Sequence, residues 1–271
     1  MWRRLLNPPH VFDQKLYESL NSSRAEVVKR LLSELKEKLG LRTAIDIGCG
    51  VGYFAGLLRN LGFEITAVDG RQENVEEARR RFPQVRFETC DAEDPGLRQL
   101  GTFDLVFCFG LLYHLQNPLL TIRHLHVMTR QLLLVEAVIF PGETPIMGLV
   151  DEGLTEDQGL SHFAFYPTEA CLVKMLYRAG FAFVYRFKKM PDHPDYRAGL
   201  GWRKVRTLLA ASHADLHSAL LTPVPEPNMA IRPWDGTSGI GGVDSVNRLL
   251  RFAGKPLPQK VQTIKRLLRR W

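Results

Sequence analysis

The clearest ligand-binding pattern in the sequence is a set of three alternating glycines, Gly48, Gly50 and Gly52, within residues 44–54. They follow an apolar run and precede a helical pattern, so they form the turn from a strand into a helix. Glycines in such a turn permit positive φ angles and let the backbone approach a ligand closely. A dinucleotide-binding GxGxxG turn would place its third glycine at position 53, which is Tyr53. The GxGxG spacing therefore argues against a dinucleotide.

An acidic residue, Asp69, follows the next apolar run. It lies 17 residues past Gly52, just after the second predicted strand. A carboxylate at this place can accept hydrogen bonds from the two ribose hydroxyls of a bound nucleoside. The alternative is a plain surface acid.

These features and two later ones resemble the motifs of the class I S-adenosylmethionine (SAM)-dependent methyltransferases. The later ones are residues 90–92, after the third predicted strand, and the strand 103–108 followed by residues 110–114. The resemblance covers residues 42–138. It implies SAM as cofactor and S-adenosylhomocysteine (SAH) as product. It also implies an α/β fold with a doubly wound, mostly parallel seven-stranded sheet, of order 3-2-1-4-5-7-6 with strand 7 antiparallel.

The resemblance also assigns residues to the cofactor. Asp91 is expected to accept a hydrogen bond from the adenine amino group, although aspartate after a strand is also a common turn or cap residue. Asp46 is expected near the methionine amino group, or else beneath the glycine turn as its hydrogen-bond acceptor. Cys49 is interpreted as selected for size rather than reactivity. The full expected set is Asp46, Gly48, Cys49, Gly50, Gly52, Asp69, Gly70, Asp91, Ala92 and Phe109.

A finer resemblance is carried by residues 110–118, 134–136, 165–168 and 176–181. It is to the tRNA wobble-uridine carboxymethyl transferases and to small bacterial methyltransferases of sugars and secondary metabolites. The carboxymethyl transferases carry a long N-terminal extension whose cationic residues bind the donor's extra carboxylate, whereas the segment before residue 42 is short here. Ordinary SAM and plain methyl transfer are therefore predicted.

Methyl transfer is an in-line displacement, so the protein supplies alignment, a dry pocket and a base where the acceptor bears a proton. His114 is the candidate base, because it follows the fourth predicted strand at the sheet edge where ligands bind and an imidazole titrates near ~6.5. The alternative is a packed or helix-capping histidine. Tyr113 is expected to shape the donor pocket or to belong to the core. Glu136 is expected to orient an acceptor hydroxyl or to pair with a surface lysine, and His162 is a further catalytic candidate.

These residues are positioned by an alternation of short apolar runs and amphipathic stretches. Such alternation indicates βαβ units and a parallel sheet with helices on both faces. The predicted strands are 43–47, 64–68, 85–87, 103–108, 131–135, 181–188 and 203–210. The predicted helices are 11–39, 52–61, 71–82, 116–129 and 167–179.

The organisation predicted from this pattern has three parts. Residues 1–40 form an N-terminal helical cap, and residues 41–212 form the SAM-binding Rossmann-like domain. Within that domain, residues 139–166 are too long for an ordinary loop and are expected to be a substrate lid. Residues 213–271 are expected to be a linker and a basic C-terminal extension.

Charge is concentrated in that extension. The 271 residues carry a net charge of +7, but residues 248–271 hold eight basic residues and no acid, which leaves the rest at −1. Nucleic acid is therefore not the favoured partner of the fold, although it stays open. In residues 260–271 the apolar positions lie on one side of a helical pattern and the basic positions on the other. This pattern fits a helix that docks on the body, on a partner or on an anionic membrane surface. The oligomeric state is left open.

Other features exclude several classes of protein. The four cysteines lack metal-ligand spacing, and no metal is predicted. No apolar run reaches the ~18 residues of a membrane span, and residues 1–9 lack a signal-peptide core, so a cytoplasmic enzyme is expected. The predicted function is transfer of a methyl group to a hydroxyl, less readily an amine, of a small molecule such as a sugar or secondary metabolite. The alternatives are an RNA-modifying methyl or carboxymethyl transferase and a non-enzymatic SAM-binding module.

Overall fold

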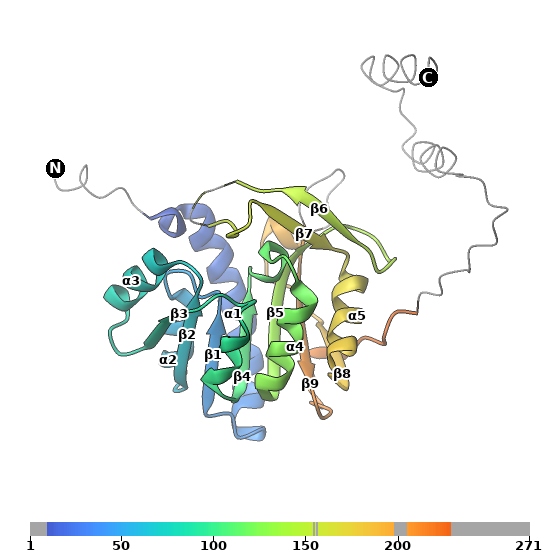
Figure 1. Ribbon diagram of the computed structural model, residues 1–271. Coiled ribbons are helices and arrows are strands. Elements are labelled where there is room, and N and C mark those ends of the chain that lie inside the picture. Colours follow the sequence, from blue (N-terminus) through green and yellow to red (C-terminus); the bar gives the residue numbers. More distant parts are fainter. Residues whose placement is uncertain (1–9, 154, 156, 198–204, 229–271) are drawn as a thin grey trace, which may run out of the picture. The chain divides into compact units, whose positions relative to one another are not determined.

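The computed structural model describes residues 10–153, 155, 157–197 and 205–228. Its centre is a twisted sheet with helices on both faces (Figure 1). The strands are β1 (Thr43–Ile47), β2 (Glu64–Asp69), β3 (Arg86–Thr89), β4 (Phe103–Phe109), β5 (Thr129–Ile139), β8 (Phe183–Phe187), β9 (Val205–Ser212) and β10 (Leu221–Pro223). Their order is β3-β2-β1-β4-β5-β9-β8-β10.

This order confirms the predicted fold class. The pairs from β3 to β5 are parallel, and β9 pairs antiparallel with both β5 and β8, as expected of the seventh strand. The structure has one strand more than predicted in this sheet: β10 pairs antiparallel with β8 at the sheet edge. The sheet therefore continues past residue 212, where the sequence predicted that the domain ends.

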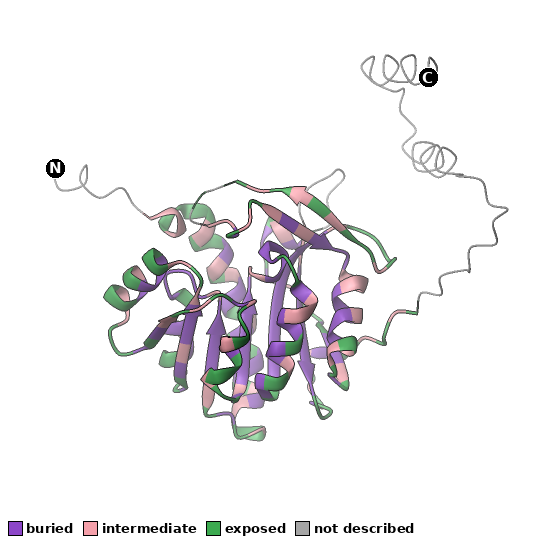
Figure 2. Ribbon diagram, viewed as in Figure 1, coloured by how far each residue is buried: buried purple, intermediate pink, exposed green. Residues whose placement is uncertain are grey.

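The helices divide between the two faces of the sheet. The first face is covered by α1 (Lys15–Lys38), α2 (Tyr53–Asn60) and α3 (Gln72–Arg81), whose apolar side chains share one core cluster. The second face is covered by α4 (Pro118–Met128) and α5 (Glu169–Ala179). Strands buried on both faces read as continuous apolar runs, and β4 and the part of β5 from Leu132 onward are accordingly buried almost throughout (Figure 2).

The starts of α4 and α5 show why these helices begin where they do. Asn117 accepts a hydrogen bond from the Leu120 backbone N–H, and Thr168 accepts one from that of Cys171. Such caps satisfy backbone donors that have no partner within the helix. On the other face, α1 places its apolar residues at helical spacing, and Gly40 follows it with φ +64°.

The predicted lid has regular structure of its own. Strands β6 (Met147–Asp151) and β7 (Phe163–Pro167) form a separate antiparallel pair, and Figure 1 shows this pair beyond the carboxyl ends of β4 and β5. Four short 3-10 helices complete the described chain, η2 (Val11–Asp13), η3 (Pro95–Leu100), η4 (Leu112–His114) and η5 (Pro194–Tyr196).

Two predictions concern residues outside this description. The amphipathic pattern at 260–271 and most of the basic extension lie outside the described residues. Within the described residues, no helix combines the length and apolarity needed to cross a membrane.

Candidate active site

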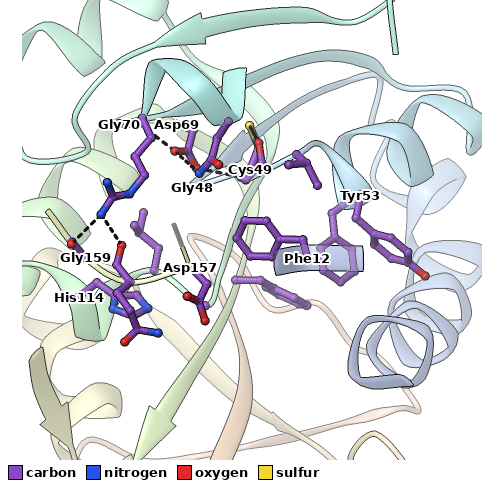
Figure 3. A pocket seen from close by; sticks show the side chains of 18 of the residues that line it. Phe12, Gly48, Cys49, Tyr53, Asp69, Gly70, His114, Asp157 and Gly159 are labelled. Carbon is purple, nitrogen blue, oxygen red and sulfur yellow. Dashed lines mark hydrogen bonds between the residues drawn. The ribbon is translucent and has the colours of Figure 1, made fainter. Parts of the chain in front are cut away.

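A pocket of about 580 Å³ lies at the carboxyl ends of the parallel strands. It is lined by the glycine turn after β1, the ends of β2, β3 and β4, helix α1 and the loop after β6. Its volume is in the range of sites for small molecules and cofactors. Figure 3 shows Gly48, Cys49 and Asp69 grouped on one side of it, and His114 with Gly159 on another.

The glycine turn has a backbone conformation and close neighbours that leave little room for side chains. Gly48 and Gly50 have φ values of +76° and +52°, which disfavour residues with a Cβ. A Cβ on Gly48 would lie 3.0 Å from Leu111, and one on Gly50 would lie 3.2 Å from Phe12. Gly52 caps α2 with φ +86° and does not line the pocket.

Asp69 holds this turn against the end of β2. Its Oδ2 accepts a hydrogen bond from the Gly50 N–H at 2.8 Å. Its Oδ1 accepts from the Arg71 N–H at 2.9 Å and from Asn74 Nδ2 at 3.1 Å. An ionised carboxylate has about four acceptor positions, so Asp69 keeps capacity for a ligand in the pocket that it lines.

The other expected cofactor residues divide into two groups. Cys49, Gly70, Asp91, Ala92 and Phe109 line the pocket. Asp46 does not: it is 2% exposed and accepts a hydrogen bond from the Ala55 N–H. Its burial, with the charge of Asp69, raises its pKa to about 8. Its hydrogen-bond donor thus lies in α2 and not in the glycine turn, so this contact differs from the predicted support of the turn.

The Cys49 side chain is largely shielded from solvent within the turn. It is 9% exposed, and burial raises its pKa well above the usual value. A thiol with a raised pKa is a poor nucleophile at neutral pH.

His114 is paired with a carboxylate that the sequence did not single out. Its Nδ1 lies 2.7 Å from the Glu152 carboxylate, which also accepts a hydrogen bond from the Gly159 N–H at 2.9 Å. The His114 residue is 8% exposed and the Glu152 side chain 3%. When Nδ1 donates to a carboxylate, Nε2 is left as the acceptor of the ring. The pair lines the pocket, so an imidazole acceptor nitrogen is available next to it.

The loop that carries Glu152 has two further anchors. The Arg71 Nη2 donates to the carbonyl oxygens of Gln158 at 3.2 Å and Gly159 at 3.0 Å, as the dashed lines in Figure 3 show. The Tyr17 hydroxyl donates to the Asp157 carboxylate. The predicted lid is thus tied to α1, to the turn after β2 and to the base candidate.

Glu136 is placed differently from either prediction. It is fully buried and does not line the pocket, so it neither faces an acceptor nor pairs with a surface lysine. It accepts hydrogen bonds from Arg24 at 2.9 Å, Arg206 at 3.1 Å and the Tyr196 hydroxyl at 2.9 Å. Burial raises the pKa of Glu136, but the two guanidiniums outweigh that effect and hold its pKa below the usual value.

Of the two remaining catalytic candidates, one lines the pocket and the other does not. Tyr113 lines the pocket, is 6% exposed and accepts a hydrogen bond from Arg206 at 3.4 Å. His162 is exposed, has φ +62° and does not line the pocket. The structure therefore does not bring His162 to the site.

Sequence reasoning missed Glu152, Arg24 and Arg206. Glu152 belongs to the predicted lid and lies 38 residues from His114. Arg24 and Glu136 are 112 residues apart. No local pattern marks such pairs, because only folding brings them together.

These residues fit a nucleoside cofactor with an amino-acid tail. Gly48 and Gly50 hold the turn in a conformation that disfavours side chains, and Asp69 at the end of β2 and Asp91 after β3 both line the pocket. The glycine turn, the acid at the end of β2 and the imidazole after β4 have the positions in the sheet that the resemblance to class I SAM-dependent methyltransferases implies.

Comparisons with known proteins agree. Residues 45–131 match a family described as methyltransferase domain. The ubiquinone biosynthesis O-methyltransferase of Xanthomonas axonopodis pv. citri (strain 306) is 35% identical over 114 residues, which are 41% of this chain and 46% of that protein. The tRNA U34 carboxymethyltransferase of Tolumonas auensis is 26% identical over 212 residues, which are 74% of this chain and 61% of that protein. The chain thus spans about half the length of the first of these relatives.

Solved structures share the fold at low sequence identity. The N-terminal domain of EvdMO1 with SAH bound has a TM-score of 0.58 at 20% identity, covering 69% of this chain and 80% of that one. Magnesium protoporphyrin IX methyltransferase from Synechocystis PCC 6803 with bound SAM has a TM-score of 0.51 at 20% identity, covering 79% and 93%. Residues 45–131 carry a methyltransferase domain, as the resemblance predicted, and the solved structures with SAH or SAM bound share its fold.

Proposed function

We propose that the protein transfers the methyl group of SAM to a hydroxyl of a small molecule. The observation that supports this most is the His114–Glu152 pair in the pocket wall. When bound, SAM supplies a methyl carbon activated by its sulfonium. The chain must then hold that cofactor, place the acceptor oxygen in line and remove a proton from it.

The pair is suited to the last of these tasks. Glu152 orients the imidazole through Nδ1 and balances the positive charge that His114 gains when Nε2 takes a proton. Both side chains are shielded from solvent, which strengthens their interaction. Residues 157–161 of the same lid segment also line the pocket, where they would limit the access of competing water.

A hydroxyl acceptor needs such a base more than an amine does. An alcohol is a weak nucleophile while it keeps its proton, whereas a neutral amine attacks through a lone pair that is already free. A buried imidazole acceptor would therefore add most to the rate for a hydroxyl, by ~10²–10⁴ for general base catalysis.

An acceptor panel tests this proposal. Purified protein is incubated with SAM that carries an isotopically labelled methyl group and with hydroxylated compounds, each paired with its amine analogue. We expect label in the methyl ethers of one or more hydroxyl compounds, and inhibition by SAH. Transfer to the amines alone would contradict the hydroxyl assignment.

A second candidate is modification of RNA. Its support is the similarity to the tRNA U34 carboxymethyltransferase, which extends over 74% of this chain. Against it stands the near-neutral charge of residues 1–247. Contacts to phosphates produce binding that weakens steeply with salt, so retention of transfer RNA at moderate ionic strength would favour this candidate.

A SAM-binding module without catalysis is the third reading. It would require only the residues that hold the cofactor. The buried His114–Glu152 pair has no role in such a module, so the structure favours an enzyme.

A further inference from the structure

Arg71 connects the glycine-turn side of the pocket with the lid. It follows Asp69 and Gly70 at the end of β2, and it lines the pocket. Its backbone N–H donates to Asp69 Oδ1 at 2.9 Å, and Asp69 Oδ2 accepts from the Gly50 N–H at 2.8 Å. The backbone of Arg71 is therefore fixed by the same carboxylate that holds the glycine turn.

The Arg71 side chain bonds to the backbone of the lid. Its Nη2 donates to the carbonyl oxygens of Gln158 at 3.2 Å and Gly159 at 3.0 Å (Figure 3). Both residues lie outside helices and strands, and Gly159 is buried. Backbone polar groups that are away from water need hydrogen-bond partners, and the guanidinium is a partner for these two carbonyl groups.

Gly159 contacts the base candidate on its other side. Its N–H donates to Glu152 Oε2 at 2.9 Å, and the Glu152 carboxylate lies 2.7 Å from His114 Nδ1. A Cβ on Gly159 would lie 3.0 Å from His114 Cβ, so the backbone of residue 159 packs directly on His114. One glycine thus lies between Arg71 and the His114–Glu152 pair.

The position of Glu152 determines which imidazole nitrogen of His114 can accept a proton. A neutral imidazole carries its proton on only one of its two nitrogens. A carboxylate at Nδ1 keeps the proton there and leaves Nε2 as the acceptor. If Glu152 moves away, the proton is free to occupy Nε2, and this nitrogen then no longer accepts a proton from a ligand.

We propose that Arg71 is a positioning residue for His114. By holding the backbone of residues 158–159, it keeps Glu152 at Nδ1 and leaves Nε2 free to accept a proton. This inference rests on the proposed function, in which His114 is the base. The hydrogen bonds of Arg71 to other described residues go to Asp69, Gln158 and Gly159, so its effect on His114 passes through the lid.

The other anchor of this segment acts at a different point. The Tyr17 hydroxyl donates to the Asp157 side chain, whereas Arg71 holds the backbone of the two following residues. The carbonyl group of Gly159 belongs to the same residue as the N–H that Glu152 accepts. Loss of the Arg71 side chain is therefore expected to release Gly159 even while Asp157 stays attached to α1.

Hydrogen exchange at the Gly159 amide tests the proposal without an acceptor. This N–H bonds to Glu152 and exchanges when the lid opens locally. Arg71→Met keeps an apolar side chain but removes the donors. We expect exchange at Gly159 to become at least about fivefold faster, as loss of two hydrogen bonds predicts. Exchange within about twofold of wild type in the folded variant would overturn the proposal.

The protonated nitrogen of His114 is the second readout. Long-range nitrogen–proton NMR spectra of protein with isotopically labelled histidine, in mildly alkaline buffer, distinguish the two neutral forms of the ring. We expect the form protonated at Nδ1 in wild type and a larger share of the other form in Arg71→Met. Glu152→Ala, which removes the carboxylate, is the positive control. Faster exchange at Gly159 with unchanged His114 spectra would overturn the link to the base.

Variants of matched chemistry assign the effect to Arg71. Arg79 on α3 also donates to a carbonyl group, that of Phe87, but does not line the pocket, so Arg79→Met should keep both readouts at wild-type values. Arg71→Lys keeps a charged donor and should restore part of both. A Lys variant no closer to wild type than Arg71→Met would contradict the proposal. SAH binding and a cooperative thermal transition report folding, and Arg71→Gln replaces a Met variant that does not fold.

The outcomes separate this inference from the proposed function. If exchange and the His114 spectra respond as expected but the acceptor panel gives no methyl ether, the proposed function fails and Arg71 still positions His114. If a hydroxyl is methylated but folded Arg71→Met leaves both readouts unchanged, the inference alone fails.

Discussion

Gly159 is a tightly packed position of the lid next to His114, and a methyl group there is predicted to separate the lid from the base. A Cβ on Gly159 would lie 2.8 Å from the His114 carbonyl oxygen, 2.9 Å from Glu152 Oε2 and 3.0 Å from His114 Cβ. The first of these contacts is with backbone, which cannot rotate aside. Gly159→Ala must therefore move the lid segment or the Glu152 side chain, and either shift disturbs the 2.7 Å contact between Glu152 and His114.

The size of the effect follows from this overlap. Overpacking of a tight site costs ~1–3 kcal/mol. This cost corresponds to a roughly 5- to 150-fold fall in the population of molecules in which the lid holds Glu152 against His114. We expect kcat/KM for the acceptor to fall within this range. SAH affinity should change by less than about threefold, which is under ~1 kcal/mol, because Asp69 and the glycine turn are untouched.

Gly153→Ala is the matched control. It adds the same methyl group to the same lid, but nothing lies within 4 Å of its Cβ position. Steady-state kinetics with the acceptor found in the panel, and calorimetry with SAH, are measured for both variants. The reasoning fails if Gly159→Ala keeps at least about half of the wild-type kcat/KM, well above the loss expected from ~1–3 kcal/mol, or if Gly153→Ala loses as much.

Four other predictions concern the cofactor site, the base, a buried acid and the C-terminal extension. Asp69→Ala should weaken SAH binding by ~1.5–3 kcal/mol, because three of its acceptor positions are already used within the protein and one hydrogen bond to a charged group contributes about that much; calorimetric affinity unchanged within about threefold would remove its ribose assignment. His114→Gln should lower turnover by at least ~10² while SAH affinity stays nearly intact, and near-normal turnover would make His114 structural. The pKa of Asp46 rises from 3.8 to about 8 on folding, so its contribution to stability is present below pH 4 and is lost as pH rises toward 8, by at most ~1.4 kcal/mol per pH unit. Asp46→Asn should therefore gain stability relative to wild type across that window in denaturant titrations, and a pH-independent difference would contradict the raised pKa. Full-length protein and a truncation after Val243 should partition differently onto anionic vesicles if residues 260–271 lie on membranes, whereas equal co-sedimentation would exclude that role.

The sequence alone predicted the features whose signals are local. The GxGxG spacing identified the cofactor turn, because a turn that brings backbone to a ligand needs glycine at fixed positions. Alternating apolar runs predicted each strand from β1 to β5, because a parallel sheet buried on both faces needs continuous apolar segments. The edge strand β10, which pairs with β8, was not predicted, because a strand of three residues leaves too short a pattern in the sequence.

Tertiary structure decided which polar side chains meet. His114 acquires Glu152 from the lid, and Arg206 meets Tyr113 across 93 residues of sequence. Glu136 and His162 are of residue types as suitable for catalysis as His114, but neither lines the pocket. Glu136 is fully buried, and His162 is exposed to solvent. Residue type gives a side chain its chemistry, but its partners and its access to the pocket depend on how distant segments pack. That packing is a property of the whole fold and leaves no periodic trace in the sequence.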